Sequence, residues 1–301
     1  MVVDVFTDTP LQGNQLAVFT DGRGIAEELL QPLAREMAFS ETVYCYPATQ
    51  HASPNEAGWQ VTVRRESDGS VSVPPSTEAD VRIRIFTPDR ELPFAGHPTL
   101  GTAFVLGAPL QLGVVRLETG AGIIPVELER EGARIVFGRM QQPIPVAEPY
   151  AREAELLAAL GVERSGLPVE AYLNGPLHVY VELESEAAVA ALRPDAAALV
   201  PLDIGANCFA GSGACWKTRM FAPAHGVLED AATGSAAGPL AVHLARHGRI
   251  AWGDEIEISQ GAEIGRPSTL YARATGSAER IESVEVGGSA VVVARGEFRL
   301  P

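Results

Sequence analysis

The chain has 301 residues, of which 46% are hydrophobic and 20% charged, so its composition excludes a disordered protein and its length predicts two domains. The 23 Lys and Arg residues against 38 Asp and Glu give a net charge of −15. This charge disfavours nucleic acid and anionic membrane surfaces as partners, but it permits a small anionic substrate, because a helix N-terminus can oppose the overall field locally.

The first half of the chain is predicted to combine short strands with two helices. Apolar β-rich runs predict strands at 2–6, 16–21 and 41–48, the first two forming a hairpin, and helical spacing predicts a helix over 25–38. Residues 49–80 are polar and rich in Pro and Ser, which indicates a hairpin insertion or a surface excursion. A strand at 81–88 then leads through a loop into a helix of small residues.

The second half repeats this order of elements. Strands are predicted at 178–185 and 213–223, and a loop and an Ala- and Gly-rich helix follow within 224–248. In both halves a strand ending in F-x-P precedes a Gly-rich loop, and Gly96-His97 aligns with Gly234-Ser235. The repeat predicts two similar halves, 1–118 and 119–301, with the β-rich C-terminus free to return to the first half.

Two glycines mark the expected starts of the small-residue helices. Gly96 and Gly234 expose backbone N–H groups at the positive end of a helix dipole, an arrangement that binds anions. If the halves are related by a pseudo-twofold axis, we expect both helix starts to face one cleft and a carboxylate to bind between them. The plainer interpretation is two capped helix starts without a ligand.

Three titratable residues adjoin these helix starts. His97 lies where the helix dipole disfavours its cation, Asp230 precedes Gly234, and Glu41 begins a predicted strand. A carboxylate in a closed apolar cleft has a raised pKa and can exchange one proton near neutral pH. Asp230 alternatively caps the following helix, and Glu91 is an outside candidate for the same chemistry.

Several other chemistries find no support in the sequence. The chain lacks G-x-G-x-x-G after its first strand, G-x-x-x-x-G-K-[ST] and G-x-S-x-G. His243 and His247 have metal-like i, i+4 spacing, but without a matching acidic or sulfur ligand we interpret them as a solvated helix face and predict no metal site. Cys45, Cys208 and Cys215 are interpreted as buried small hydrophobic residues in a reducing compartment.

The first residues lack the basic and apolar regions of a signal peptide, and no apolar stretch approaches 18 residues. We therefore expect a cytoplasmic protein.

Five segments resemble the phenazine-biosynthesis isomerase (PhzF-like) family in their order and spacing. These segments are DVFTDTPLQGNQLAVF, FSETVY, RIRIFTPDRELPFAGHPTLGTAFVLG, LETGAGIIPVELE and EDAATGSAAGPLAVHL. The resemblance implies an α+β, diaminopimelate-epimerase-like fold: two similar halves, each a mostly antiparallel sheet around a central helix, with the active site between them. It also implies a homodimer that uses no cofactor.

The resemblance also implies roles for particular residues. Glu41 is expected to move a proton between substrate carbons, while His97 and Asp230 hold and polarise the substrate. The residues expected to bind the substrate and its carboxylate are Asn14, Gly96, Thr233, Gly234 and Ser235. Related epimerases and proline racemases use two facing cysteines, whereas neither glycine loop of this chain contains one.

Three functions remain open at this point. The first is a cofactor-independent isomerase of a small cyclic or unsaturated amino or hydroxy acid, similar to the dihydro-hydroxyanthranilate isomerase of phenazine biosynthesis. The second is an epimerase or racemase without the two-cysteine mechanism. The third is a small-molecule-binding protein that retains the cleft without turnover.

Overall fold

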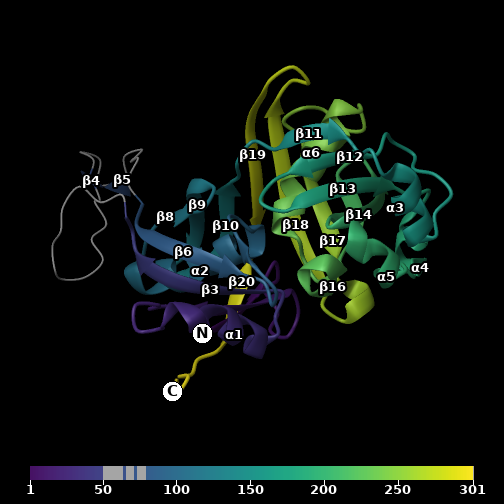
Figure 1. The fold of residues 1–301 in the computed structure, drawn as a ribbon. Helices are drawn as coiled ribbons and strands as arrows, with labels where there is room; N and C mark the ends of the chain where they lie inside the picture. Colours follow the sequence, from purple (N-terminus) through teal and green to yellow (C-terminus); the bar gives the residue numbers. More distant parts are fainter. Residues whose placement is uncertain (50–63, 66–70, 73–78, 301) are drawn as a thin grey trace.

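The computed structural model describes residues 1–49, 64–65, 71–72 and 79–300 (Figure 1). Most of the insertion expected at 49–80 lies outside the described residues. Two short strands within it are described, β4 (Arg64–Arg65) and β5 (Val71–Ser72), and they pair antiparallel.

The first half alternates strands with two helices, α1 and α2. Its elements are β1 (Val2–Val5), β2 (Asn14–Phe19), α1 (Glu27–Met37), β3 (Glu41–Pro47), β6 (Val81–Phe86), β7 (Glu91–Leu92), α2 (Gly96–Leu110), β8 (Val114–Thr119), β9 (Gly122–Glu131) and β10 (Arg134–Gln141). The predicted first hairpin is present, since β1 and β2 pair antiparallel. Pro32 lies within α1 without ending it.

The second half follows with a similar series and a final strand. Its strands are β11 (Val146–Pro149), β12 (Glu170–Leu173), β13 (Leu177–Glu182), β14 (Gly205–Ser212), β15 (Cys215–Ala222), β16 (Val227–Asp230), β17 (Glu255–Gln260), β18 (Ser268–Gly276), β19 (Ile281–Gly288) and β20 (Ala290–Ala294). Its helices are α3 (Glu153–Leu160), α4 (Glu186–Ala191), α5 (Ala196–Leu199), α6 (Gly234–Arg246) and the short 3-10 turns Val200–Leu202, Pro223–His225 and Ala262–Ile264.

The two halves have the same strand topology. In the first half, β1, β2, β3, β6, β8, β9 and β10 are neighbours in that order, paired antiparallel, parallel, antiparallel, parallel, antiparallel and antiparallel. In the second, β12, β13, β14, β15, β17, β18 and β19 repeat the same pairings. The last strands of the two series, β10 and β19, pair antiparallel and join the halves. Figure 1 shows these halves side by side.

A central helix fills the inside of each sheet. Of the 15 residues of α2, 11 are buried, as are 12 of the 13 residues of α6, and α2 is surrounded by strands of the first half on several sides. Small residues are needed for this packing: a Cβ on Gly101 would lie 2.6 Å from the Val5 side chain and 2.7 Å from that of Leu16. The Ala- and Gly-rich composition of these helices is therefore a consequence of their enclosure.

The contacts suggest a different division from the one expected at 118/119. Strands β9 and β10 follow that boundary, yet they pack on α2 together with β8. Strand β20 pairs antiparallel with β1 and also contacts α2. We propose that the first half comprises residues 1–141 together with β20. Among the helices of the described residues, none combines the length and apolar character needed to cross a bilayer.

Candidate active site

The two central helices meet at their N-termini, where the sequence predicted paired glycine loops. Helix α2 begins at Gly96 and α6 at Gly234. A Cβ on Gly96 would lie 2.4 Å from the carbonyl carbon of Gly234 and 2.5 Å from the Ser235 nitrogen. The backbones are thus in contact at this point, and the binding of a carboxylate beside the paired helix starts stays a prediction.

A cavity lies beside the joined helix starts instead. It is lined from both halves, by Ser40, Glu41, Thr87, Leu92, Pro176, His178, Gly205, Met220, Ala222, His225, Val227, Asp230, Thr233 and Ser235. Four of the predicted site residues are among them: Glu41, Asp230, Thr233 and Ser235. The other four, Asn14, Gly96, His97 and Gly234, are not lining residues, and Asn14 and His97 are buried.

Glu41 presents an unpaired carboxyl oxygen in this region. It is the first residue of β3, and its Oε2 is buried without a hydrogen-bond partner in the described structure. The same oxygen lies 3.4 Å from Nδ1 of His97. Burial raises the pKa of the Glu41 carboxyl well above its usual range, and the nearby Asp230 carboxylate raises it further. Glu41 is therefore prepared to carry a proton at a pH where an exposed carboxyl is ionised.

Asp230, by contrast, is held by hydrogen-bond donors. It ends β16, and its carboxylate accepts hydrogen bonds from the Thr233 hydroxyl at 2.7 Å and from Asn14 Nδ2 at 2.8 Å. Burial raises the pKa of Asp230, and these hydrogen bonds offset only part of that rise. Because the donors stabilise its charged form, we infer that Asp230 ionises before Glu41 and that the pair holds one proton on Glu41.

Asn14, in the first half, is joined by hydrogen bonds to residues of the second half near the cavity. Its Oδ1 accepts from Ser40 at 2.9 Å, and its Nδ2, besides bonding to Asp230, donates to the Ala232 carbonyl at 2.8 Å. The same nitrogen lies 3.2 Å from Nδ1 of His97. Burial lowers the pKa of His97 to about 3, so this imidazole is neutral. Because the two N–H groups of Asn14 are donated to Asp230 and Ala232, Nδ1 of His97 is left to accept the proton of Glu41.

Polar residues that the sequence did not single out position the Asp230 loop and the start of α6. Gln260 donates to the Asp230 carbonyl and the Thr233 hydroxyl, both at 2.9 Å. Gln142 donates to the Gly234 carbonyl and Asn174 to the Ser235 carbonyl, both at 2.8 Å. These side chains come from distant strands and connections, so no local motif marks them.

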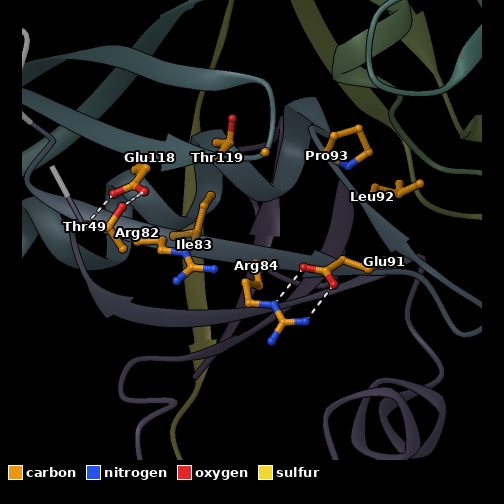
Figure 2. Close-up of a pocket in the computed structure, with 10 residues that line it drawn as sticks. Thr49, Arg82, Ile83, Arg84, Glu91, Leu92, Pro93, Glu118 and Thr119 are labelled. Atoms are coloured by element: carbon orange, nitrogen blue, oxygen red, sulfur yellow. Dashed lines mark hydrogen bonds and ion pairs between the residues drawn. The ribbon is translucent and has the colours of Figure 1, made fainter. Parts of the chain in front are cut away.

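A more open groove lies on the first half (Figure 2). Two pairs of its side chains are bonded to each other: Arg84 bonds to Glu91 through two nitrogens, and Thr49 bonds to Glu118. Glu91, the outside candidate, is exposed and belongs to this groove. None of its lining residues except Leu92 lines the cavity that contains Glu41 and Asp230.

Two expectations about the second half are wrong. His243 does not lie on a solvated helix face: it is fully buried, and its Nδ1 and the Nε2 of His247 each lie 3.1 Å from Glu170 Oε2. We call these three residues the Glu170 cluster. Glu170, from β12, is the acidic neighbour that the sequence spacing did not reveal. Cys215 is exposed, whereas Cys45 and Cys208 are buried as expected.

The arrangement can exchange a proton with a ligand. It places a protonatable carboxyl and a hydrogen-bonded carboxylate at one cavity between two halves of the chain, with a neutral imidazole beside the first of them. Such a pair of carboxyl groups with separated pKa values is suited to general acid–base chemistry at carbon.

Comparison with known proteins is consistent with this chemistry. The PhzC-PhzF family model, described as phenazine biosynthesis-like protein, matches residues 3–296. The chain is 51% identical over 301 residues to a trans-2,3-dihydro-3-hydroxyanthranilate isomerase of Pseudomonas aeruginosa, covering 100% of this chain and 99% of that protein. It is 48% identical, with the same coverage, to the isomerase of that name from Pseudomonas chlororaphis. The structure of a PhzF-family phenazine biosynthesis protein from Bacillus anthracis superposes with a TM-score of 0.79 at 23% identity, covering 99% of this chain and 98% of that one.

Proposed function

The chain belongs to the PhzC-PhzF family of phenazine biosynthesis-like proteins and is an isomerase, and from this premise we propose that its substrate is trans-2,3-dihydro-3-hydroxyanthranilate. One observation carries the proposal: identity of about half, over the whole chain, to enzymes named for that substrate. The cavity supports it, because Glu41, whose side chain is 12% exposed, and the buried Asp230 line one space.

We assign the proton transfer to Glu41. In the fraction of molecules in which Glu41 is ionised, its carboxylate accepts a proton from one ring carbon, and the electron pair of the broken C–H bond enters the conjugated system of the substrate. The protonated Glu41 then returns the proton to a different carbon, so atoms and charge balance within one substrate molecule. The raised pKa of Glu41 serves both steps, since it strengthens the base and brings its proton affinity closer to that of the carbon acid.

We assign supporting roles to Asp230 and His97. Asp230 faces the cavity as an anion held by Thr233 and Asn14, and it can accept hydrogen bonds from the substrate amino or hydroxyl group. His97 lies behind Glu41, with Nδ1 at 3.4 Å from its Oε2, and can accept the Glu41 proton in a hydrogen bond. The neutral imidazole thereby orients the protonated carboxyl.

The substrate carboxylate is assigned to the start of α6. Thr233 and Ser235 line the cavity, and the first N–H groups of a helix attract an anion. Gly96 and Gly234 serve this site by allowing the helices to touch, and Asn14 serves it by holding Asp230. We also propose, by analogy with the family, that the protein is a cytoplasmic homodimer.

The test is conversion of synthetic trans-2,3-dihydro-3-hydroxyanthranilate, followed by proton NMR in D2O without added cofactor. We expect the substrate signals to disappear at a rate proportional to enzyme concentration. The new C–H position carries protium if the proton on Glu41 is transferred directly, and deuterium if it first exchanges with solvent. A matched control is the Glu91→Gln protein, altered at a carboxyl of the open groove and expected to be fully active. A lack of conversion by the wild-type protein, with conversion of a related amino or hydroxy acid, would contradict the substrate assignment.

A further inference from the structure

A buried histidine of the second half, His178, lines the same cavity as Glu41. It comes from β13, is 1% exposed, and lines the cavity together with Ser235. Its Nε2 lies 3.0 Å from the Ser235 hydroxyl oxygen, and its Nδ1 lies 3.3 Å from Nδ2 of Asn207. These contacts form a chain of three polar side chains that ends in the cavity.

The direction of the hydrogen bonds in this chain follows from the Asn207 amide. Its Nδ2 also donates to the Gly205 carbonyl at 2.8 Å, which fixes the amide nitrogen, rather than its oxygen, toward His178. An amide nitrogen can only donate, so Nδ1 of His178 accepts and carries no proton. The one proton of the neutral imidazole is therefore on Nε2, and Nε2–H donates to Ser235 Oγ.

Because the Ser235 oxygen accepts a hydrogen bond from His178, its own proton must be donated to a group other than His178. Within the described residues its sole hydrogen-bond partner is His178, which already supplies a proton. The free O–H of Ser235 thus points toward the cavity, beside the N-terminus of α6. The same tautomer prevents His178 from acting as a base toward Ser235, as when an asparagine replaces the aspartate of a Ser-His-Asp triad.

We propose that Asn207 and His178 are positioning residues that lock the Ser235 hydroxyl as a hydrogen-bond donor into the cavity, toward the carboxylate of the substrate. This inference rests on the proposed function for the identity of the substrate, but not for the tautomer of His178. Burial supports it, since it lowers the pKa of His178 to about 3 and keeps the ring neutral. A donor that is already oriented loses little freedom when the anion binds.

The decisive variant is Asn207→Asp, which is nearly isosteric but reverses the chain of hydrogen bonds. A carboxylate at this position accepts from Nδ1–H, Nε2 becomes an acceptor, and the Ser235 hydroxyl turns away from the cavity to donate to it. We expect kcat/KM for trans-2,3-dihydro-3-hydroxyanthranilate to fall about 10- to 100-fold, mostly through KM, the range for a lost hydrogen bond to a charged group. Ser235→Ala is expected to show a similar loss.

The double variant separates positioning from a structural role. Because both changes remove the same donor, Asn207→Asp combined with Ser235→Ala is expected to be no less active than Ser235→Ala alone. His178→Gln, which can keep an N–H near Ser235, is expected to retain more activity than His178→Leu. A further loss of equal size when Asn207→Asp is added to Ser235→Ala, or full activity of Asn207→Asp, would overturn the proposal.

The tautomer of His178 can be measured without substrate and provides a second test. Nitrogen-15 chemical shifts of the ring are expected to show protonated Nε2 in the wild-type protein and protonated Nδ1 in Asn207→Asp, with His178→Gln assigning the signal. A protonated Nδ1 in the wild type would overturn the inference. A wild-type protein that shows the expected tautomer but does not turn over this substrate would instead refute the proposed function.

Discussion

Replacing Gly96 by alanine tests the contact that brings the two halves of the site together. The added methyl carbon would lie 2.4 Å from the Gly234 carbonyl carbon and 2.5 Å from the Ser235 nitrogen, about 1 Å closer than van der Waals contact allows. Both neighbours are backbone atoms at the start of a buried helix, so no flexible side chain can relieve the overlap. The helix starts must separate by roughly 1 Å.

Two effects are expected from this separation. Overpacking of a buried contact costs about 1–3 kcal/mol in the free energy of unfolding, which corresponds to a Tm lower by about 2–5 °C for a cooperative unit of this size. The displacement also moves His97 and Ser235, and a shift of about 1 Å at a site can cost roughly 100-fold in turnover.

Differential scanning calorimetry and the NMR conversion assay measure the two effects on the same samples. Gly234→Ala is expected to be milder, since its Cβ contacts are no shorter than 3.0 Å, and Gly24→Ala, with nothing within 4 Å, is the control. Alanine otherwise favours a helix over glycine, so any loss reports the contact itself. A Gly96→Ala protein with the Tm and turnover of Gly24→Ala would refute the reasoning.

Three further predictions follow from the same groups. Because burial raises the pKa of Glu41 in the folded state, the wild-type protein loses stability as pH rises from the unfolded-state pKa to the folded-state pKa. Glu41→Gln should therefore have a higher urea midpoint than wild type at pH 8, with a free energy of unfolding larger by about 1.4 kcal/mol for each unit by which the two pKa values differ, and the same midpoint as wild type at pH 4. Equal midpoints at both pH values would contradict the burial argument. His97→Ala should lower turnover more than substrate affinity, as measured by kcat against KM, because its ring contacts Glu41 and does not line the cavity; an effect on KM alone would indicate direct substrate contact. Exhaustive chelation should leave turnover unchanged, because His243 lies about 12 Å along α6 from Ser235, so an ion bound at the Glu170 cluster would lie away from the cavity. Activity restored by one divalent ion would contradict this.

Local patterns in the sequence predicted much of the fold and part of the site. The starts of α2 and α6 at Gly96 and Gly234 follow from glycine and small-residue patterns, and strand β3 follows from its β-rich run. Glu41 and Asp230 could be selected because each adjoins such a feature. Their meeting in one cavity depends on the joining of the halves through β10 and β19, which no local pattern encodes.

Residues whose partners are distant in sequence were missed or misread. His178 and Asn207 are ordinary members of two strands until β13 and β14 pair, which brings Asn207 to His178, and until α6 places Ser235 against His178. His243 has a polar side chain on a helix, but that helix is enclosed on all sides, so helical spacing alone could not predict its burial. Exposure of Cys215 likewise depends on its place at the beginning of β15.

The central claim, that Glu41 carries the proton between substrate carbons, is tested most directly by single-turnover kinetics of Glu41→Gln beside Asp230→Asn. Glutamine keeps the shape and hydrogen bonding of Glu41 but removes its proton transfer. We predict that Glu41→Gln binds trans-2,3-dihydro-3-hydroxyanthranilate with nearly wild-type affinity while its chemical step slows by about 10²–10⁴-fold, the range for a lost general acid–base group. If Glu41→Gln instead keeps most of its activity and Asp230→Asn is inactive, the proton is carried by Asp230 and the assignment is wrong.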